Sequence, residues 1–250
     1  MKAAILQPAY LPWLGFFDLM DQVDTFVLLD NVQFEKRSWQ QRNRIKSPAG
    51  LLWLTVPVKS RGRFEQQIAQ AEIGEPDFWR DHLRSIEMNY RRAPFFTNYF
   101  EECAGIFRTS GGGLLIDLTS TLIKWLARKL GVNTPILRAS DLQKAGKRTE
   151  LLTDLCVKLH ASQYLSPIGS AVYLLAEMEL MNSRGIAVTF QNYVHPEYTQ
   201  LFPPFIPYAS VLDLLFNEGP GSLARIRDGR REPFRPEQVA AQLAQGSVNG

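Results

Sequence analysis

A histidine that follows a predicted strand is the residue best suited to proton transfer in this chain. His195 comes just after the apolar run Ile186–Tyr193, and Glu197, Tyr198 and Gln200 follow it closely. Because imidazole titrates near neutral pH, a histidine in such a loop can act as a general base. We therefore predict His195 as catalytic, with Tyr198 and Gln200 contacting substrate. An ordinary loop histidine is the alternative.

A carboxylate with neighbouring amides forms a second candidate group. The apolar run Thr25–Leu29 ends at Asp30, which Asn31 and Gln33 follow. These side chains could hold a hydroxyl group, an amine or a metal. We predict Asp30 as catalytic and Asn31 and Gln33 as substrate contacts. The alternative is an aspartate that only caps the local turn.

The loop after the first predicted strand, Lys2–Leu6, is a third candidate. It contains Gln7, Tyr10 and Trp13, and it reaches a predicted helix near Gly15. In open α/β sheets, ligands bind beyond the carboxyl ends of the strands, and a helix N-terminus there suits an anion. We predict all four residues as substrate contacts. A rigid turn with aromatic residues in the core is the alternative.

A basic segment with an aromatic residue inside it comes next. Five cations lie between positions 36 and 46, and Lys59, Arg61 and Arg63 extend the run. Arginine binds phosphate or carboxylate through two parallel hydrogen bonds. The segment could therefore contact a nucleotide, a nucleotide sugar or RNA, or it could be a solvated face. The residues predicted to contact substrate are Lys36, Arg37, Trp39, Arg42, Asn43 and Arg44.

Two later segments add smaller candidates. Ser166 lies in a loop between a predicted strand and a helix, where its hydroxyl could contact substrate. This loop does not have the pattern of a nucleophile elbow, so Ser166 is not predicted as a nucleophile. Asp213 and Asn217 lie one turn apart on a predicted helix that starts at Ser210. We predict both as substrate contacts.

The elements that must position these residues alternate between strands and helices. A strand, a loop, a helix and a second strand open the chain, and the second half repeats the alternation. This pattern predicts an α/β fold with a mostly parallel sheet between helices, in three Rossmann-like layers. The basic segment 36–63 is expected as an insertion apart from the sheet. We predict one domain over residues 1–221 and a C-terminal tail over 222–250.

Composition limits the class of protein. An apolar share of 45% allows a sizeable core, and a net charge of +3 does not indicate a nucleic-acid partner without a local patch. Cys103 and Cys156 are expected as core residues. The chain shows no signal peptide and no apolar stretch long enough for a membrane span, so we expect a cytoplasmic protein. It has none of the common cofactor or zinc fingerprints, so the sequence leaves both the cofactor and the metal unknown.

Several motifs together resemble one known family. They are ILQPAYLPWLGFFDLM, VDTFVLLDNVQFEKRSWQQRNRIK, GLLWLTVPV, KRTELL, YLSPIGSAVYL and HPEYTQLFPPFIPYASVLDLLFNEGP. In this order they are similar to WbqC-like proteins from about residue 2 to about residue 221. Pro167 and the segment 203–209 depart from the family pattern. The resemblance implies a role in O-antigen or other surface-polysaccharide biosynthesis, with transfer of an aminoacyl group such as glycyl to a sugar.

The function predicted from these features is an acyl or aminoacyl transferase acting on an amino sugar or another small amine. His195 would take a proton from the amine, and Asp30 would hold the amine or a hydroxyl group. Arg42 and Arg44 would bind an anionic or phosphate-bearing small molecule. An ATP-dependent ligase or nucleotidyl transferase is one alternative. A non-catalytic protein that binds RNA or a glycan is another.

Overall fold

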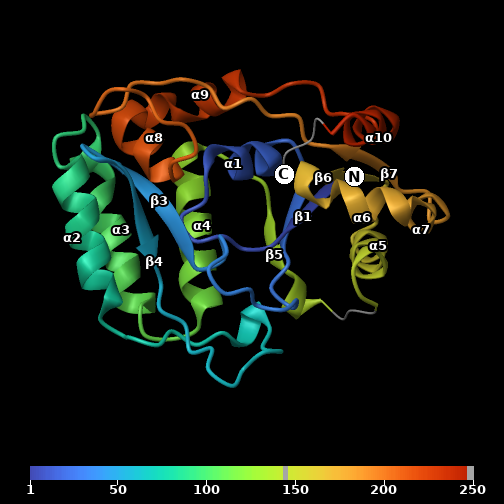
Figure 1. The fold of residues 1–250 in the computed structure, drawn as a ribbon, viewed down its shortest axis with the longest axis horizontal. Coiled ribbons are helices and arrows are strands. Elements are labelled where there is room, and N and C mark those ends of the chain that lie inside the picture. Colours follow the sequence, from blue (N-terminus) through green and yellow to red (C-terminus); the bar gives the residue numbers. More distant parts are fainter. Residues whose placement is uncertain (143–145, 247–250) are drawn as a thin grey trace.

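Five parallel strands form the central sheet, in the order β5-β2-β1-β6-β7. The computed structural model describes residues 1–142 and 146–246. Figure 1 shows the sheet between helices, which confirms the predicted α/β fold with a parallel sheet. The strands are β1 (Lys2–Leu6), β2 (Thr25–Leu28), β5 (Ile136–Arg138), β6 (Gln163–Ser166) and β7 (Ala187–Phe190).

The two faces of the sheet belong to different hydrophobic clusters. Ala4 points into one cluster, whereas its neighbours Ala3 and Ile5 point into the other, as strand geometry requires. The helices in the Ala4 cluster are α1 (Leu14–Asp21), α2 (Phe78–Tyr90), α3 (Phe96–Ser110), α4 (Leu115–Leu130), α8 (Val211–Glu218) and α9 (Ser222–Asp228). The helices in the Ala3 cluster are α5 (Thr149–Lys158), α6 (Ala171–Ala176), α7 (Met178–Asn182) and α10 (Pro236–Ala244).

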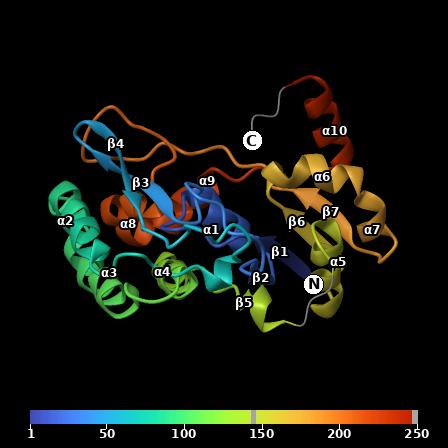
Figure 2. The same cartoon turned by 60° about the horizontal axis from the view of Figure 1, so that its bottom comes forward.

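The basic segment forms a separate antiparallel hairpin of β3 (Arg42–Ser47) and β4 (Gly50–Thr55). Figure 2 shows this hairpin beside α2 and α8 and away from the parallel sheet. The sequence analysis did not identify β3 as a strand. Its hydrophobic alternation is weak, because two of its three buried positions are the polar residues Asn43 and Lys46, and only Ile45 is apolar.

The residues after 221 continue to pack against the domain. Helix α9 lies against α1, and α10 lies against α6 and β7. Between these helices the chain runs antiparallel to the end of β7, with bridges from Arg230 to Tyr193 and from Phe234 to Phe190. Residues 247–250 of the predicted tail lie outside the described residues.

Short 3-10 turns complete the chain. They are η1 (Ile68–Gln70), η2 (Ala139–Asp141), η3 (Ile168–Ser170) and η4 (Gly219–Gly221). The first of them tethers the end of β2, because the Ala69 amide donates to the Asp30 carbonyl oxygen at 2.7 Å. The loop after β2 is therefore fixed by the segment that follows the hairpin.

Candidate functional site

Trp13 lies at the centre of an aromatic group between the β1–α1 loop and the segment after β7. Its ring centroid lies 5.6 Å from that of Tyr193 and 5.6 Å from that of Tyr208. The His195 ring stacks on it, at 6.3 Å and 16° between the planes. A Cβ atom at Gly15 would come within 2.3 Å of the Trp13 ring, so glycine is required there. The Trp13 ring thus packs directly against the Gly15 backbone at the start of α1.

His195 presents one nitrogen that has no partner. Its Nδ1 lies 2.9 Å from the Pro196 carbonyl oxygen, which can only accept, so Nδ1 carries the proton. Nε2 is therefore the lone-pair nitrogen; it is buried and has no hydrogen-bond partner in the described part of the chain. Burial lowers the pKa of His195, and the hydrogen bond to Pro196 opposes this effect. The imidazole is neutral at pH 7 and can accept a proton.

Tyr208 joins the histidine to the hairpin. Its ring centroid is 5.2 Å from that of His195, and its carbonyl oxygen accepts a hydrogen bond from Arg44 at 3.5 Å. The backbone φ of Tyr208 is 64°, a left-handed conformation that costs a non-glycine residue about 1–2 kcal/mol. Such strain is common at functional sites. Here it allows the Tyr208 ring to face His195 while the Tyr208 carbonyl oxygen faces Arg44 of β3.

The outer face of the hairpin carries two exposed tryptophans with arginines against them. Trp39 is 50% exposed and Trp53 is 43% exposed, and their ring centroids are 5.4 Å apart. The Arg42 guanidinium lies 4.3 Å from the centroid of Trp53, and that of Arg44 lies 5.3 Å from both tryptophans. We call the continuous surface from the histidine to the hairpin the aromatic–arginine strip; it consists of Trp13, Trp39, Arg42, Arg44, Trp53, His195 and Tyr208.

A buried carboxylate supports this strip from inside. Asp213 is fully buried and accepts hydrogen bonds from the hydroxyls of Tyr90 (2.9 Å) and Tyr198 (2.7 Å) and from the Gln200 amide (2.8 Å). The Lys46 side chain, 2% exposed, adds an attractive charge. Burial raises the pKa of Asp213, and the three hydrogen bonds and Lys46 oppose the shift. Asp213, Tyr198 and Gln200 thus form the internal support of the strip.

Hydrogen bonds fix the β1–α1 loop to the hairpin. The Tyr10 amide donates to the Trp39 carbonyl oxygen at 2.9 Å, and the Asn43 side chain donates to the Leu11 carbonyl oxygen at 2.7 Å. The Gln7 side chain accepts from Gln40 at 2.9 Å. These contacts place three segments that are distant in the sequence side by side. Gln7, Tyr10 and Asn43 therefore position the strip.

Tyr10 also connects this loop to α2. Its hydroxyl lies 2.7 Å from His82 Nδ1, and both side chains are buried. Burial lowers the pKa of His82 to about 4, while a hydrogen bond to the Thr55 backbone opposes the shift. His82 is thus a neutral core residue that bridges the loop, α2 and β4.

Asp30 lies apart from the strip, at the end of β2. Its fully buried carboxylate accepts hydrogen bonds from Arg138 (2.8 Å) and from the amide (2.8 Å) and hydroxyl (2.7 Å) of Ser140. In the described part of the chain, no hydrogen bond or ring contact joins it to the strip. The carboxylate fixes the segment after β5 to the end of β2.

The other predicted contacts are distributed around these two places. The Gln33 side chain donates to the Phe64 carbonyl oxygen, and Lys36 lies over the exposed Phe64 ring. Arg37 is exposed with a positive φ of 58°. Asn31 and Ser166 are buried near their strand ends, and Asn217 donates to the backbone carbonyl of Asp213 within α8. None of these contacts places them in the strip.

The family comparison covers every residue of the strip. The WbqC-like protein family matches residues 7–225. The chain is also 37% identical over 219 residues to the uncharacterized protein Rv1507c of Mycobacterium tuberculosis (strain ATCC 25618 / H37Rv), which covers 87% of this chain and 94% of that protein. The chain belongs to the WbqC-like protein family. No solved structure matches it.

In this WbqC-like chain, the sequence analysis did not find four aromatic members of the site. Trp53, Tyr193, Phe205 and Tyr208 all lie against predicted residues. Trp53 could have been found by pairing β3 with β4, because it lies opposite Arg44 in the register. Tyr208 carries no such signal, because its position depends on a left-handed backbone residue in an irregular loop.

Among residues 1–142 and 146–246, no group of histidine, cysteine, aspartate and glutamate side chains has the arrangement to hold a metal ion. The same part of the chain contains no helix with the length and apolar character that a membrane crossing requires. Cys103 and Cys156 are buried free thiols, and burial raises the pKa of each to about 12.

Proposed function

We propose that this protein is an acyl or aminoacyl transferase acting on an amino sugar or another small amine, with His195 as the base. One observation carries the proposal, namely the buried lone pair of His195 Nε2 without a hydrogen-bond partner. Buried polar atoms are normally paired in native proteins, so an unpaired one suits a group that binds against it. A lowered pKa keeps the nitrogen available near neutral pH.

The proton balance of such a transfer needs one base. The amine nitrogen attacks the acyl carbon, and His195 Nε2 takes one proton as the carbon–nitrogen bond forms. The imidazolium then gives that proton to the leaving group as its bond to the acyl carbon breaks. General base catalysis of this kind contributes about 10²–10⁴-fold to the rate. The hydrogen bond from Nδ1 to Pro196 holds the required tautomer.

The rest of the strip suits the recognition of a sugar that carries an anionic group. Arg42 and Arg44 can bind phosphate or carboxylate, and each is held over a tryptophan ring. Trp39 and Trp53 offer exposed aromatic faces, against which the apolar face of a sugar ring can pack. Asp30 lies elsewhere and, in this proposal, positions the segment at 138–140.

The test compares two histidine variants in an amide-forming assay. Acetyl and glycyl thioesters serve as donors and glucosamine as the acceptor amine, and mass spectrometry detects the new amide. We expect His195→Gln to lose about 10²–10⁴-fold in kcat. His160→Gln, which changes an exposed histidine, should retain full activity. Full activity in His195→Gln would remove this residue from the mechanism.

The tryptophan pair supports one second candidate, a non-catalytic protein that binds single-stranded RNA. Stacked aromatic faces with adjacent arginines form typical platforms for nucleic-acid bases. The same variants separate the two functions. In a transferase, Trp53→Ala raises KM for the amine, whereas His195→Gln lowers kcat. In an RNA-binding protein, only Trp53→Ala weakens binding, and the binding falls steeply with salt.

A further inference from the structure

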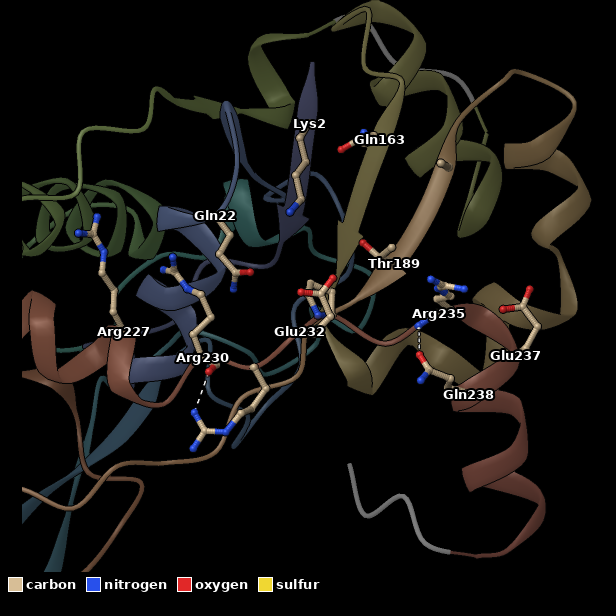
Figure 3. Close-up of a pocket in the computed structure, with 13 residues that line it drawn as sticks. Lys2, Gln22, Gln163, Thr189, Arg227, Arg230, Glu232, Arg235, Glu237 and Gln238 are labelled. Carbon is tan, nitrogen blue, oxygen red and sulfur yellow. Dashed lines mark hydrogen bonds between the residues drawn. The ribbon is translucent and has the colours of Figure 1, made fainter.

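A large open hollow lies on the other side of the molecule from the hairpin. Its volume is about 1200 Å³, more than the usual 300–1,000 Å³ of small-molecule pockets. Lys2, Gln163 and Ala187 line it from the beginnings of β1, β6 and β7. Figure 3 shows Lys2, Gln22, Thr189 and Glu232 directed toward a common space. The hollow is thus an opening over one face of the sheet, walled by the segment between α9 and α10.

Most of the residues that line this hollow carry charged or polar side chains. Its cations are Lys2, Arg227, Arg230, Arg231 and Arg235, and its carboxylates are Glu232 and Glu237. Thr189 adds a hydroxyl group, and the amides are Gln22, Gln163 and Gln238. In the described residues, no ion pair joins Lys2, Arg231 or Arg235 to a carboxylate. The Arg231 side chain already donates to the backbone carbonyl oxygens of Asp228 (2.8 Å) and Arg230 (2.7 Å), so Lys2 and Arg235 are the two cations available to an anion from solution.

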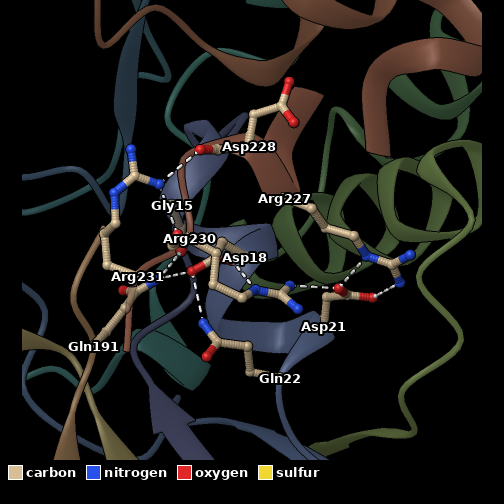
Figure 4. A network of polar contacts seen from close by, with 9 residues as sticks. All are labelled: Gly15, Asp18, Asp21, Gln22, Gln191, Arg227, Asp228, Arg230 and Arg231. Atoms are coloured by element: carbon tan, nitrogen blue, oxygen red, sulfur yellow. Dashed lines mark hydrogen bonds and ion pairs between the residues drawn. The ribbon is translucent and has the colours of Figure 1, made fainter. Parts of the chain in front are cut away.

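A buried ionic network makes one wall rigid. Asp18 is fully buried and accepts hydrogen bonds from Gln191 (2.7 Å) and from Arg230 (2.8 Å). Asp21 accepts two hydrogen bonds from Arg227, both at 2.8 Å, and one from Arg230. Figure 4 shows these arginines bound to carboxylates of α1. The network fixes the chain immediately before Arg231 and Glu232, which line the hollow.

Lys2 lies among charges of both signs. Burial lowers its pKa and the charge of Arg230 lowers it further, while the carboxylates of Asp24, Glu232 and Asp18 oppose the shift. A bound phosphate or carboxylate would reverse this effect, because an opposite charge favours the charged lysine.

The neutral and acidic members of the lining favour hydroxyl groups on the same ligand. A carboxylate accepts hydrogen bonds from hydroxyls, and a glutamine amide can both donate and accept. Glu232, Gln163 and Thr189 lie among the cations, so a bare inorganic ion would leave them without partners. A ligand that bears one anionic group and several hydroxyls matches both parts of the lining.

We propose that this hollow binds a sugar that carries a phosphate or carboxylate group, with Lys2 and Arg235 on the anion and Glu232 on the hydroxyls. The inference does not rest on the transferase chemistry proposed above. Anion and hydroxyl recognition both contribute, so the affinity for a sugar phosphate exceeds that for inorganic phosphate and for the neutral sugar. Sugars that carry a phosphate and sugars that carry a carboxylate present the same combination of one anionic group and several hydroxyl groups.

Isothermal titration calorimetry on the full chain tests the proposal. The probes are glucose 6-phosphate, glucuronate, inorganic phosphate and glucose. We expect glucose 6-phosphate or glucuronate to bind more tightly than phosphate and glucose, and the stronger of the two identifies the anionic group. Arg235→Gln and Lys2→Gln should each weaken this binding about tenfold, the effect of one lost charged hydrogen bond. Arg92→Gln, at an exposed arginine outside the hollow, should leave it unchanged.

A third variant separates the two parts of the site. Glu232→Gln removes a negative charge, so it should strengthen the binding of inorganic phosphate. The preference for glucose 6-phosphate over phosphate should fall, because a hydroxyl acceptor is weakened. The proposal is overturned if no probe binds, if phosphate alone binds as tightly as the sugar phosphate, or if Arg92→Gln weakens binding as much as Arg235→Gln. Tighter binding of a single-stranded RNA than of any sugar probe would also overturn it.

Discussion

The aromatic–arginine strip and the basic hollow hold their charges in different ways. In the strip, Arg42 and Arg44 lie against tryptophan rings, and the support beneath is a buried carboxylate with three hydrogen-bond donors. In the hollow, Arg231 and Arg235 are exposed to solvent. Charges in water are screened by salt, whereas desolvated ones are screened much less. The strip is therefore built for specific contact, and the hollow for contact that depends on ionic strength.

The largest expected effect comes from removing the support of the strip. Asp213→Ala leaves two tyrosine hydroxyls without their acceptor and leaves Lys46 buried without its opposite charge. Breaking a buried charged group of this kind costs about 3–5 kcal/mol. Urea denaturation measures the loss in free energy of unfolding.

An exposed carboxylate provides the control for Asp213. Within residues 1–142 and 146–246, the Asp228 side chain forms an ion pair with Arg225 alone, and 58% of it is exposed, so Asp228→Ala should cost at most about 1 kcal/mol. Equal losses in the two variants would show that the strip has no special support. The strip and the hollow would then not differ in how strongly buried charges stabilise them.

A pH effect of intermediate size should come from His82, which joins the loop under the strip to α2. Its pKa falls from 6.5 to about 4 on folding, so the unfolded chain binds the proton more tightly than the folded chain. The resulting stability is fully present above pH 6.5 and is lost as the pH falls toward 4. The difference is worth about 3 kcal/mol.

Denaturation of the wild type and of His82→Gln at several pH values measures this contribution. The wild type should lose more stability than the variant between pH 6.5 and pH 4.5. His195 has a lowered pKa too, so some slope should remain in His82→Gln and decrease further when His195→Gln is added. Equal slopes in the wild type and His82→Gln would contradict the buried neutral state of this residue.

The smallest expected effects lie in the wall of the hollow, where two arginines form a matched pair. Arg227 binds Asp21 at the surface, with 54% of its side chain exposed, so Arg227→Gln should cost about 0–1 kcal/mol. Arg230 also binds Asp18, which is fully buried, so Arg230→Gln should cost about 1–3 kcal/mol. Thermal unfolding at low and high salt measures both.

Salt should separate these two variants further. The cost of Arg227→Gln should shrink at high ionic strength, because more than half of the Arg227 side chain is exposed to solvent. The cost of Arg230→Gln should persist, because the second partner is desolvated. If the stability costs of both variants depended strongly on salt, the ion pairs of Arg227 and of Arg230 would both be screened by solvent.

Local sequence patterns predicted most of the sheet and part of the strip. The apolar runs at the start of the chain and at 163–166 are strands, and the polar segment with Trp39 lies apart from the sheet. The strip contains five of the predicted residues, namely Trp13, Trp39, Arg42, Arg44 and His195. These could be found because each lies in or beside a loop that follows a strand, or in a dense basic run.

Other parts of the molecule could not be found by the same means. Asp30 and His195 both follow a strand, but Asp30 meets an arginine from β5 and His195 meets a tryptophan ring. The hollow combines Lys2 with Arg235, which lie at opposite ends of the sequence. The sequence around Lys2 or Arg235 does not indicate that the two residues line one hollow, because the path of the chain after α9 brings Arg235 there.

The sequence by itself determined the strands, the helices and the types of side chain available at their ends. Hydrophobic periodicity and turn residues act over a few positions, so they can be read locally. Only the tertiary structure decided which polar groups are buried and paired, as Asp213 and Asp18 are, and which are buried without a hydrogen-bond partner in the described residues, as His195 Nε2 is. The reason is physical, since pairing and desolvation depend on neighbours that the chain brings together from distant segments.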